Sequence, residues 1–168
     1  MTDQKNILIL GIGNLLLKDE GVGVHVVERL KAMPLPENVE VLDGATGGLD
    51  LLYYIGSRKK LIVIDAVNAG EKPGTLYRLA EENLEAKPKT FFSSLHEIDF
   101  LDALDMAETM GIKPGETVVI GIEPKDMSDG TELSPEIEER IPEIIKVVMK
   151  ELNCHSEQSE ESQGVISK

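Results

Sequence analysis

The apolar and polar positions along the chain follow two alternating patterns. Short continuous apolar runs predict buried strands at 6–10, 39–43, 60–66 and 117–122, and an alternating run predicts an edge strand at 74–79. Apolar positions at helical spacing predict helices at 22–33, at about 49–57, from Ser94 to about Met110, and from Pro135 to about Leu152. The polar stretch between Ala80 and Thr90 predicts a loop or a short helix.

Two of these helices carry start signals. Ser94 and Glu97 have the spacing of a capping box, in which each side chain satisfies a backbone N–H of the first turn. Ser134 followed by Pro135 is typical of a cap residue and a proline at the first helical position.

Buried strands that alternate with helices indicate an α/β fold with a mostly parallel sheet covered on both faces. We expect a single domain over residues 1–152. From Asn153 the chain is rich in Ser, Glu and Gln and poor in apolar residues, so we predict a disordered acidic tail at 153–168. This tail contains Cys154 and His155, which we therefore discount as site residues.

Ligands of open parallel sheets bind outside the carboxyl ends of the strands. That rule points to the segments 11–20, 43–48, 65–70 and 123–130, which follow the predicted parallel strands.

Composition narrows the possible partners. The 168-residue chain has a formal net charge of −14, only 4% aromatic residues and no Trp, which argues against nucleic-acid binding. Its single cysteine excludes an internal disulfide and favours a reducing compartment. The first apolar run, Ile7 to Leu10, is too short for a signal peptide or a membrane span. We therefore expect a cytoplasmic protein without a membrane partner.

Gly11 and Gly13, after the first strand, raise the possibility of a nucleotide-binding module. A dinucleotide fingerprint requires a third glycine that opens a helix, but Leu16 occupies that position. The alternative is that the two glycines permit a tight turn.

Three side chains are the strongest candidates for chemistry, and each has a simpler explanation. Glu20, beside Asp19, could merely complement a helix dipole. Asp65 ends a buried apolar run, where a carboxylate is costly unless it is paired or bound to metal, but it could be a turn residue. His96 could be an ordinary residue near a helix start.

Two carboxylates and one imidazole suit a divalent transition metal that keeps open positions for water or substrate. The three residues lie in different loops of the predicted fold, and their spacing does not by itself establish that they converge.

The string ILILGIGNLLLKDEGVG, followed by LDGATGG and LIVIDAV, resembles the nickel–iron hydrogenase maturation proteases. The resemblance covers about residues 6–150. It implies a three-layer α/β/α sandwich with a mostly parallel five-stranded sheet. It also implies an endopeptidase that removes the C-terminal extension of a hydrogenase large-subunit precursor after nickel insertion.

By position, the resemblance assigns metal binding and catalysis to Glu20, Asp65 and His96. The nickel is carried by the precursor, and other divalent metals could occupy the same site. Asp19, Asp43 and Thr46 are candidates for substrate binding or for a general base, although Ala45 replaces a glycine that is usual in this turn.

We expect a monomer whose partner is the precursor. A non-catalytic nickel-binding assembly factor with the same ligands remains the alternative function.

Overall fold

The computed structural model describes residues 5–45, 48–92, 100–154 and 164–167. In chain order its elements are β1 (Ile7–Ile12), η1 (Lys18–Gly21), α1 (Val22–Lys31), β2 (Val39–Ala45), α2 (Asp50–Ile55), β3 (Lys60–Ala66), β4 (Leu76–Ala80), α3 (Glu81–Leu84), η2 (Lys89–Phe91), α4 (Phe100–Thr109), β5 (Glu116–Ile122), α5 (Pro135–Glu138), α6 (Ile141–Leu152) and β6 (Gly164–Ser167), where η marks a 3-10 helix.

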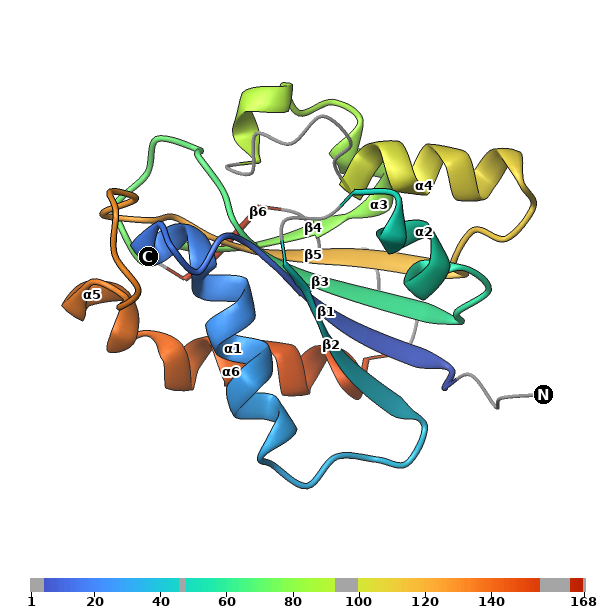
Figure 1. The fold of residues 1–168 in the computed structure, drawn as a ribbon, viewed down its shortest axis with the longest axis horizontal. Coiled ribbons are helices and arrows are strands. Elements are labelled where there is room, and N and C mark those ends of the chain that lie inside the picture. The colour runs from blue at the N-terminus through green and yellow to red at the C-terminus, as the bar shows by residue number, and fades with distance from the viewer. Residues whose placement is uncertain (1–4, 46–47, 93–99, 155–163, 168) are drawn as a thin grey trace.

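The strands form one sheet in the order β2-β1-β3-β5-β4-β6 (Figure 1). β2, β1, β3 and β5 are parallel, and β4 is antiparallel to β5. The predicted α/β fold with a mostly parallel five-stranded sheet is therefore confirmed, with β4 on the outer side of the parallel strands.

A sixth strand contradicts part of the prediction for the tail. Residues 164–167, expected to be disordered, form β6 and pair antiparallel with β4. The composition of the tail did not indicate this strand, because GVIS is a short apolar run within a polar segment.

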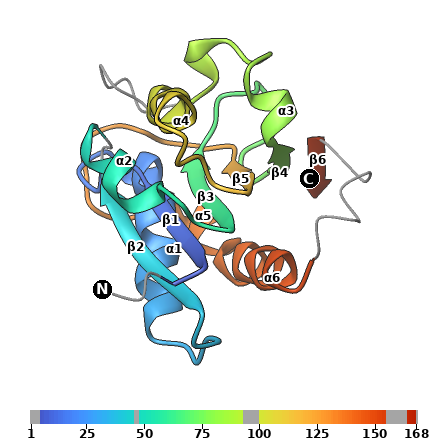
Figure 2. The ribbon, with the colours of Figure 1, turned by 90° about the vertical axis from the view of Figure 1, so that its right-hand side faces the viewer.

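The sheet has an apolar core on each face, and helices cover both (Figure 2). On β3, Leu61 and Val63 face the core covered by α2 and α4, whereas Ile62 and Ile64 face the core covered by α1 and α6. Because consecutive side chains of a strand point to opposite faces, a strand buried on both faces is apolar throughout. This explains why the continuous apolar runs predicted the strands well.

The long C-terminal helix expected from Pro135 is two helices. α5 ends at Glu138 and α6 begins at Ile141. Pro142 accounts for the break, because proline lacks a backbone N–H and its ring crowds the carbonyl group four residues earlier, here that of Glu138. Ser134 is the N-cap of α5 as predicted, but its side chain forms no capping bond.

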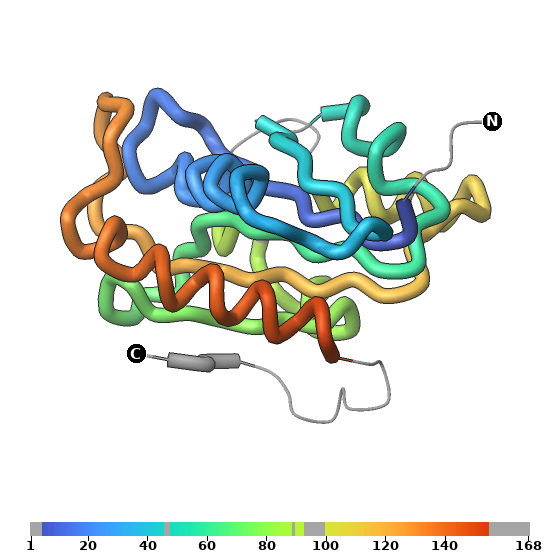
Figure 3. The backbone as a smooth tube through the Cα atoms, turned by 90° about the horizontal axis from the view of Figure 1, so that it is seen from below, coloured from blue at the N-terminus to red at the C-terminus, as the bar shows by residue number. Residues whose placement is uncertain are grey.

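At the carboxyl end of the parallel strands, two loops lie side by side. The segment between β1 and α1 contacts the segment between β5 and α5, as Figure 3 shows in blue and orange. Leu17 and Gly130 form an isolated parallel bridge between them. This contact places the predicted site segments 11–20 and 123–130 next to each other.

Candidate functional site

Two predicted site residues, Glu20 and Asp65, come together at this edge. Glu20 is the third residue of η1, and Asp65 is the penultimate residue of β3. Their exposed fractions are only 7% and 3%. The charge of Glu20 acts on Asp65 strongly enough to raise its pKa. The site is thus a buried pair of neighbouring carboxylates.

Burial is the main reason that the pKa of Asp65 lies well above its ordinary value, and the negative charge of Glu20 adds to it. One hydrogen bond acts in the opposite direction, because the backbone N–H of Ala66 donates to Oδ1 of Asp65 at 2.8 Å. A carboxylate in such surroundings favours a proton or a cation.

Two glycines allow Glu20 to approach the strand ends. A Cβ atom at Gly13, whose φ is +151°, would lie 2.1 Å from the carbonyl oxygen of Glu20. A Cβ atom at Gly23 would lie 2.1 Å from the carbonyl oxygen of Ile64, the residue before Asp65. Only glycine permits these contacts. Gly13 in the string GIGN and Gly23 in the string DEGVG therefore allow η1 and α1 to pack closely against the sheet.

Asp19, a candidate general base from the sequence, is fully buried and points into the loop after β5. Its carboxylate accepts hydrogen bonds from the backbone N–H groups of Lys125, Asp126 and Ser134 and from the Ser134 hydroxyl, at 2.7 to 3.0 Å. Asp19 therefore connects η1 to the loop after β5, and it is poorly placed for proton transfer to a substrate.

Asp43 lies at the same sheet edge, in register with Gly11 on β1. It is exposed, and its Oδ1 accepts a 2.6 Å hydrogen bond from the N–H of Ala45. Ala45 has the left-handed φ of +46°, and its carbonyl accepts a 2.7 Å bond from the N–H of Gly13. The turn thus takes its conformation despite the alanine.

The remaining predictions, His96, Thr46 and the Ser94–Glu97 capping box, lie outside the described residues. Among the residues that are described, no set of three or more His, Cys, Asp or Glu side chains is arranged to hold a metal ion. The structure therefore brings together Glu20 and Asp65 of the predicted set, and metal binding by these two residues and His96 stays a prediction.

Glu123 shapes the site edge but was not among the predicted site residues. It directly follows β5, is buried, and accepts hydrogen bonds from the N–H groups of Ala69 and Gly70 and from the Tyr77 hydroxyl. It thereby holds the loop that follows Asp65. An acid directly after a buried apolar run is the same signal that singled out Asp65, and it could have identified Glu123.

A cavity of about 690 Å³ beside α2 involves none of these residues. Its lining includes Tyr53, Leu52 and the ion pair between Arg58 and Glu40. Because these charges already neutralise each other, the cavity offers less for catalysis than the two carboxylates at the sheet edge.

Comparison with known proteins identifies the family of this chain. The family model described as hydrogenase maturation protease matches residues 24–151. The chain belongs to the hydrogenase maturation protease family. It is 39% identical over 152 residues to the hydrogenase expression/formation protein HupD of Rhodobacter capsulatus, covering 89% of this chain and 72% of that protein. It is 35% identical over 150 residues to the hydrogenase 2 maturation protease of Escherichia coli, covering 87% and 90%.

The fold agrees with that of a solved family member. The hydrogenase maturating endopeptidase HybD from E. coli superposes with a TM-score of 0.81 at 32% identity, covering 97% of this chain and 98% of that one. Membership of this protease family makes the chain a hydrolase acting on peptide bonds. It also sets aside the nucleotide-binding alternative that Gly11 and Gly13 raised. Within the described residues, no helix combines the length and apolarity needed to cross a membrane.

Proposed function

We propose that this maturation protease removes the C-terminal extension of a nickel–iron hydrogenase large-subunit precursor after nickel insertion. In this proposal Glu20, Asp65 and His96 bind the nickel that the precursor carries. The observation that carries the proposal is the buried pair formed by Glu20 and Asp65 at the carboxyl edge of the sheet.

The donor set fits a divalent transition metal. Two carboxylates and an imidazole provide oxygen and nitrogen ligands, and they leave coordination positions for ligands from the precursor. The raised pKa of Asp65 supports the same reading, because a cation would compensate the two negative charges that burial and proximity disfavour.

Nickel recognition would act as a check on the cargo. A precursor without nickel would offer the two carboxylates no cation to bind. The scissile peptide bond of that precursor would therefore not be held at the site. A site that is satisfied only by its proper partner discriminates strongly against partners that lack the recognised group.

Two routes to hydrolysis fit the family and the residues. A bound divalent cation can polarise a carbonyl group and lower the pKa of bound water to about 7. Alternatively, a carboxylate can act as general base. Of the two acids considered for this role, exposed Asp43 is better placed than Asp19, whose oxygens already accept four hydrogen bonds.

The other candidate function is a non-catalytic nickel-binding assembly factor with the same ligands, and membership of a protease family weighs against it. Incubation with a nickel-loaded large-subunit precursor separates the two. The protease should reduce the precursor's mass by that of its C-terminal extension and leave a nickel-free precursor intact. An unchanged mass of the confirmed nickel-loaded, cognate precursor would refute the protease.

We further propose that the enzyme acts as a monomer in the cytoplasm. The single cysteine suits a reducing compartment, and the net charge of −14 disfavours close association of two copies.

A further inference from the structure

Among the residues that the structure describes near the site, Asp19 accepts the most side-chain hydrogen bonds, and all four come from residues far away in the sequence. Its four bonds reach residues 106 to 115 positions further along the chain. Hydrogen bonds to a charged acceptor are stronger than those between neutral groups. Asp19 is therefore a strong tie between the segment that carries Glu20 and the loop after β5.

Backbone hydrogen bonds run along the same contact. The N–H of Asp19 donates to the carbonyl of Asp126 at 3.0 Å, and the N–H of Lys18 donates to that of Gly130 at 2.9 Å. In return, the N–H of Gly130 donates to the carbonyl of Leu16 at 2.9 Å. The two segments, which run beside each other in Figures 1 and 3, are thus bonded in both directions.

The hydroxyl of Ser134 adds to the bonding between η1 and the loop after β5, and it does not cap its own helix. A serine at the N-cap usually accepts a hydrogen bond from the first turn, which stabilises a helix. Here the hydroxyl donates to Oδ2 of Asp19 at 2.7 Å, and α5 has no side-chain cap. The start of α5 is therefore connected through Ser134 to η1.

η1 needs external support to keep Glu20 in place. It has four residues and no side-chain cap, and short 3-10 helices have weak hydrogen-bond geometry. α1 follows η1 directly and packs so closely on β3 that a Cβ atom at Gly23 would lie 2.1 Å from the carbonyl oxygen of Ile64, so a shift of η1 would move Glu20 relative to Asp65.

We propose that Asp19 is a positioning residue, which holds Glu20 beside Asp65 by bonding η1 to the loop of residues 124–134. This inference rests on the proposed function, in which Glu20 and Asp65 bind nickel. Groups that orient metal ligands from outside the coordination sphere commonly change metal affinity about 10- to 100-fold when they are replaced.

Asp19→Asn tests the proposal, because asparagine keeps the shape but places an NH₂ donor where oxygen accepts. Ser134→Ala removes only the hydroxyl bond and keeps the proposal testable if Asp19→Asn folds poorly. Isothermal titration with Ni²⁺ alone should give a dissociation constant raised about 10- to 100-fold for Asp19→Asn and raised less for Ser134→Ala.

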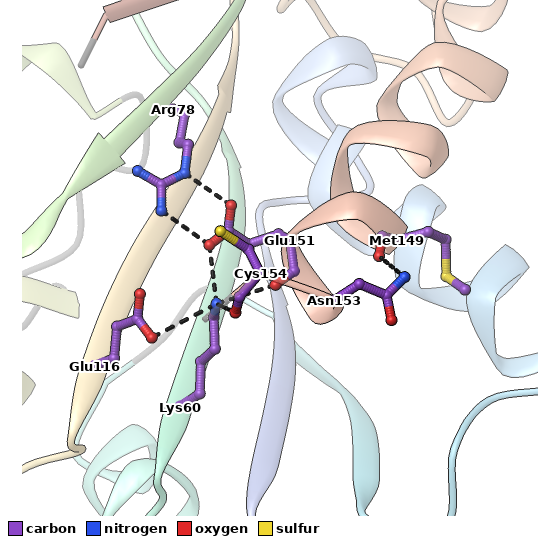
Figure 4. Close-up of polar contacts among 7 residues, drawn as sticks. All are labelled: Lys60, Arg78, Glu116, Met149, Glu151, Asn153 and Cys154. Carbon is purple, nitrogen blue, oxygen red and sulfur yellow. Dashed lines mark hydrogen bonds and ion pairs between the residues drawn. The ribbon is translucent and has the colours of Figure 1, made fainter. Parts of the chain in front are cut away.

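The matched control is Glu151→Gln, whose contact with Lys60 (Figure 4) lies at the start of β3, at the other end of that strand from Asp65. Glu151 is 5% exposed and accepts hydrogen bonds from Lys60 at 2.9 Å and from Arg78 at 2.7 and 2.9 Å. Lys60 begins β3, roughly 16 Å along the strand from Asp65. This variant should lower the Tm by roughly 5 °C or more, while its dissociation constant for Ni²⁺ stays within about twofold of the wild-type value.

Hydrogen exchange gives a second reading that does not require nickel. The backbone amides of residues 18 and 19 should exchange faster in Asp19→Asn than in the wild type. In Glu151→Gln they should exchange at the wild-type rate. Wild-type affinity for Ni²⁺ in Asp19→Asn, or equal weakening in Glu151→Gln, would overturn the positioning role. If the wild-type protein neither bound Ni²⁺ nor cleaved the loaded precursor, the proposed function would fail. Even in that case, an unchanged rate of amide hydrogen exchange in η1 of Asp19→Asn would refute the proposal that Asp19 keeps Glu20 in position.

Discussion

Gly13 lies so close to Glu20 that a Cβ atom on Gly13 would be 2.1 Å from the Glu20 carbonyl oxygen. The shape of the turn after β1 and the position of a proposed nickel ligand are therefore set by the same contact. A substitution at Gly13 should consequently affect both stability and metal binding.

We expect Gly13→Ala to lower the free energy of unfolding by more than about 3 kcal/mol, because a methyl group meets backbone and the φ of +151° disfavours any side chain. It should also abolish Ni²⁺ binding. Gly70→Ala is the control, since its φ is +82° but no atom lies within 4 Å of the added Cβ. Urea unfolding should show a cost of about 1–2 kcal/mol there. Equal costs at the two positions would contradict the contact.

Ala45→Gly should stabilise the protein. Ala45 has a φ of +46°, where an L-residue with a side chain is strained by about 1–2 kcal/mol. Glycine relieves the strain but loses more chain entropy on folding, which leaves a net gain of about 0.5–1 kcal/mol. Ala32→Gly is the matched control, because Ala32 has an ordinary right-handed conformation and the change should destabilise. A loss of stability in Ala45→Gly, measured by urea unfolding, would refute the strain.

The pKa of Asp65 predicts a dependence of stability on pH. Because the folded-state pKa lies well above the ordinary value of 3.8, the folded protein holds a proton that the unfolded chain has already released. The free energy of unfolding of the metal-free protein should therefore fall as pH rises from about 3.8 through the folded-state pKa. Asp65→Asn should lack this fall.

The comparison of the two proteins by urea unfolding between pH 4 and pH 8 isolates Asp65. The pKa of Glu151, which hydrogen bonds from Arg78 and Lys60 lower against the effect of burial, gives stability that is lost as pH falls. That contribution is the same in both proteins. A difference in unfolding free energy that did not change with pH would contradict the raised pKa.

Removal of any proposed ligand should stop cleavage. Glu20→Gln, Asp65→Asn and His96→Gln each keep side-chain size but weaken or remove a metal ligand, so cleavage of the nickel-loaded precursor should fall at least about 100-fold. Circular dichroism should show an intact fold. His155→Gln, in the acidic tail, is the control and should cleave normally. Retained cleavage in Asp65→Asn would argue against metal recognition by this site.

The strands were predictable because a strand that is buried on both faces consists of a continuous run of apolar residues. β3 has the predicted bounds of 60–66. The break before α6 was missed because the helical spacing of its apolar residues outweighed the signal of Pro142. β6 was missed because it is short and lies in a polar tail.

The site was only partly predictable. The approach of Glu20 to Asp65 depends on close packing at Gly13 and Gly23, and sequence spacing alone did not establish it. The bonds of Asp19 were out of reach altogether, because Ser134 lies 115 residues away and no local pattern links the two. The role of His96 stays a prediction.

The antiparallel direction of β4 has a consequence for how this scaffold can be altered. The chain leaves β3 and enters β4 at the same edge of the sheet, so residues 67–75 form an extra loop beside the proposed site. Its exposed residues 71–73 lie beyond the Ala69 and Gly70 amides that Glu123 binds, and they take no part in the pairing of β3 with β5. Insertions there should be tolerated as in other surface loops. This loop is therefore a suitable position for grafting a reporter or a new recognition sequence next to the proposed site while strand register is preserved.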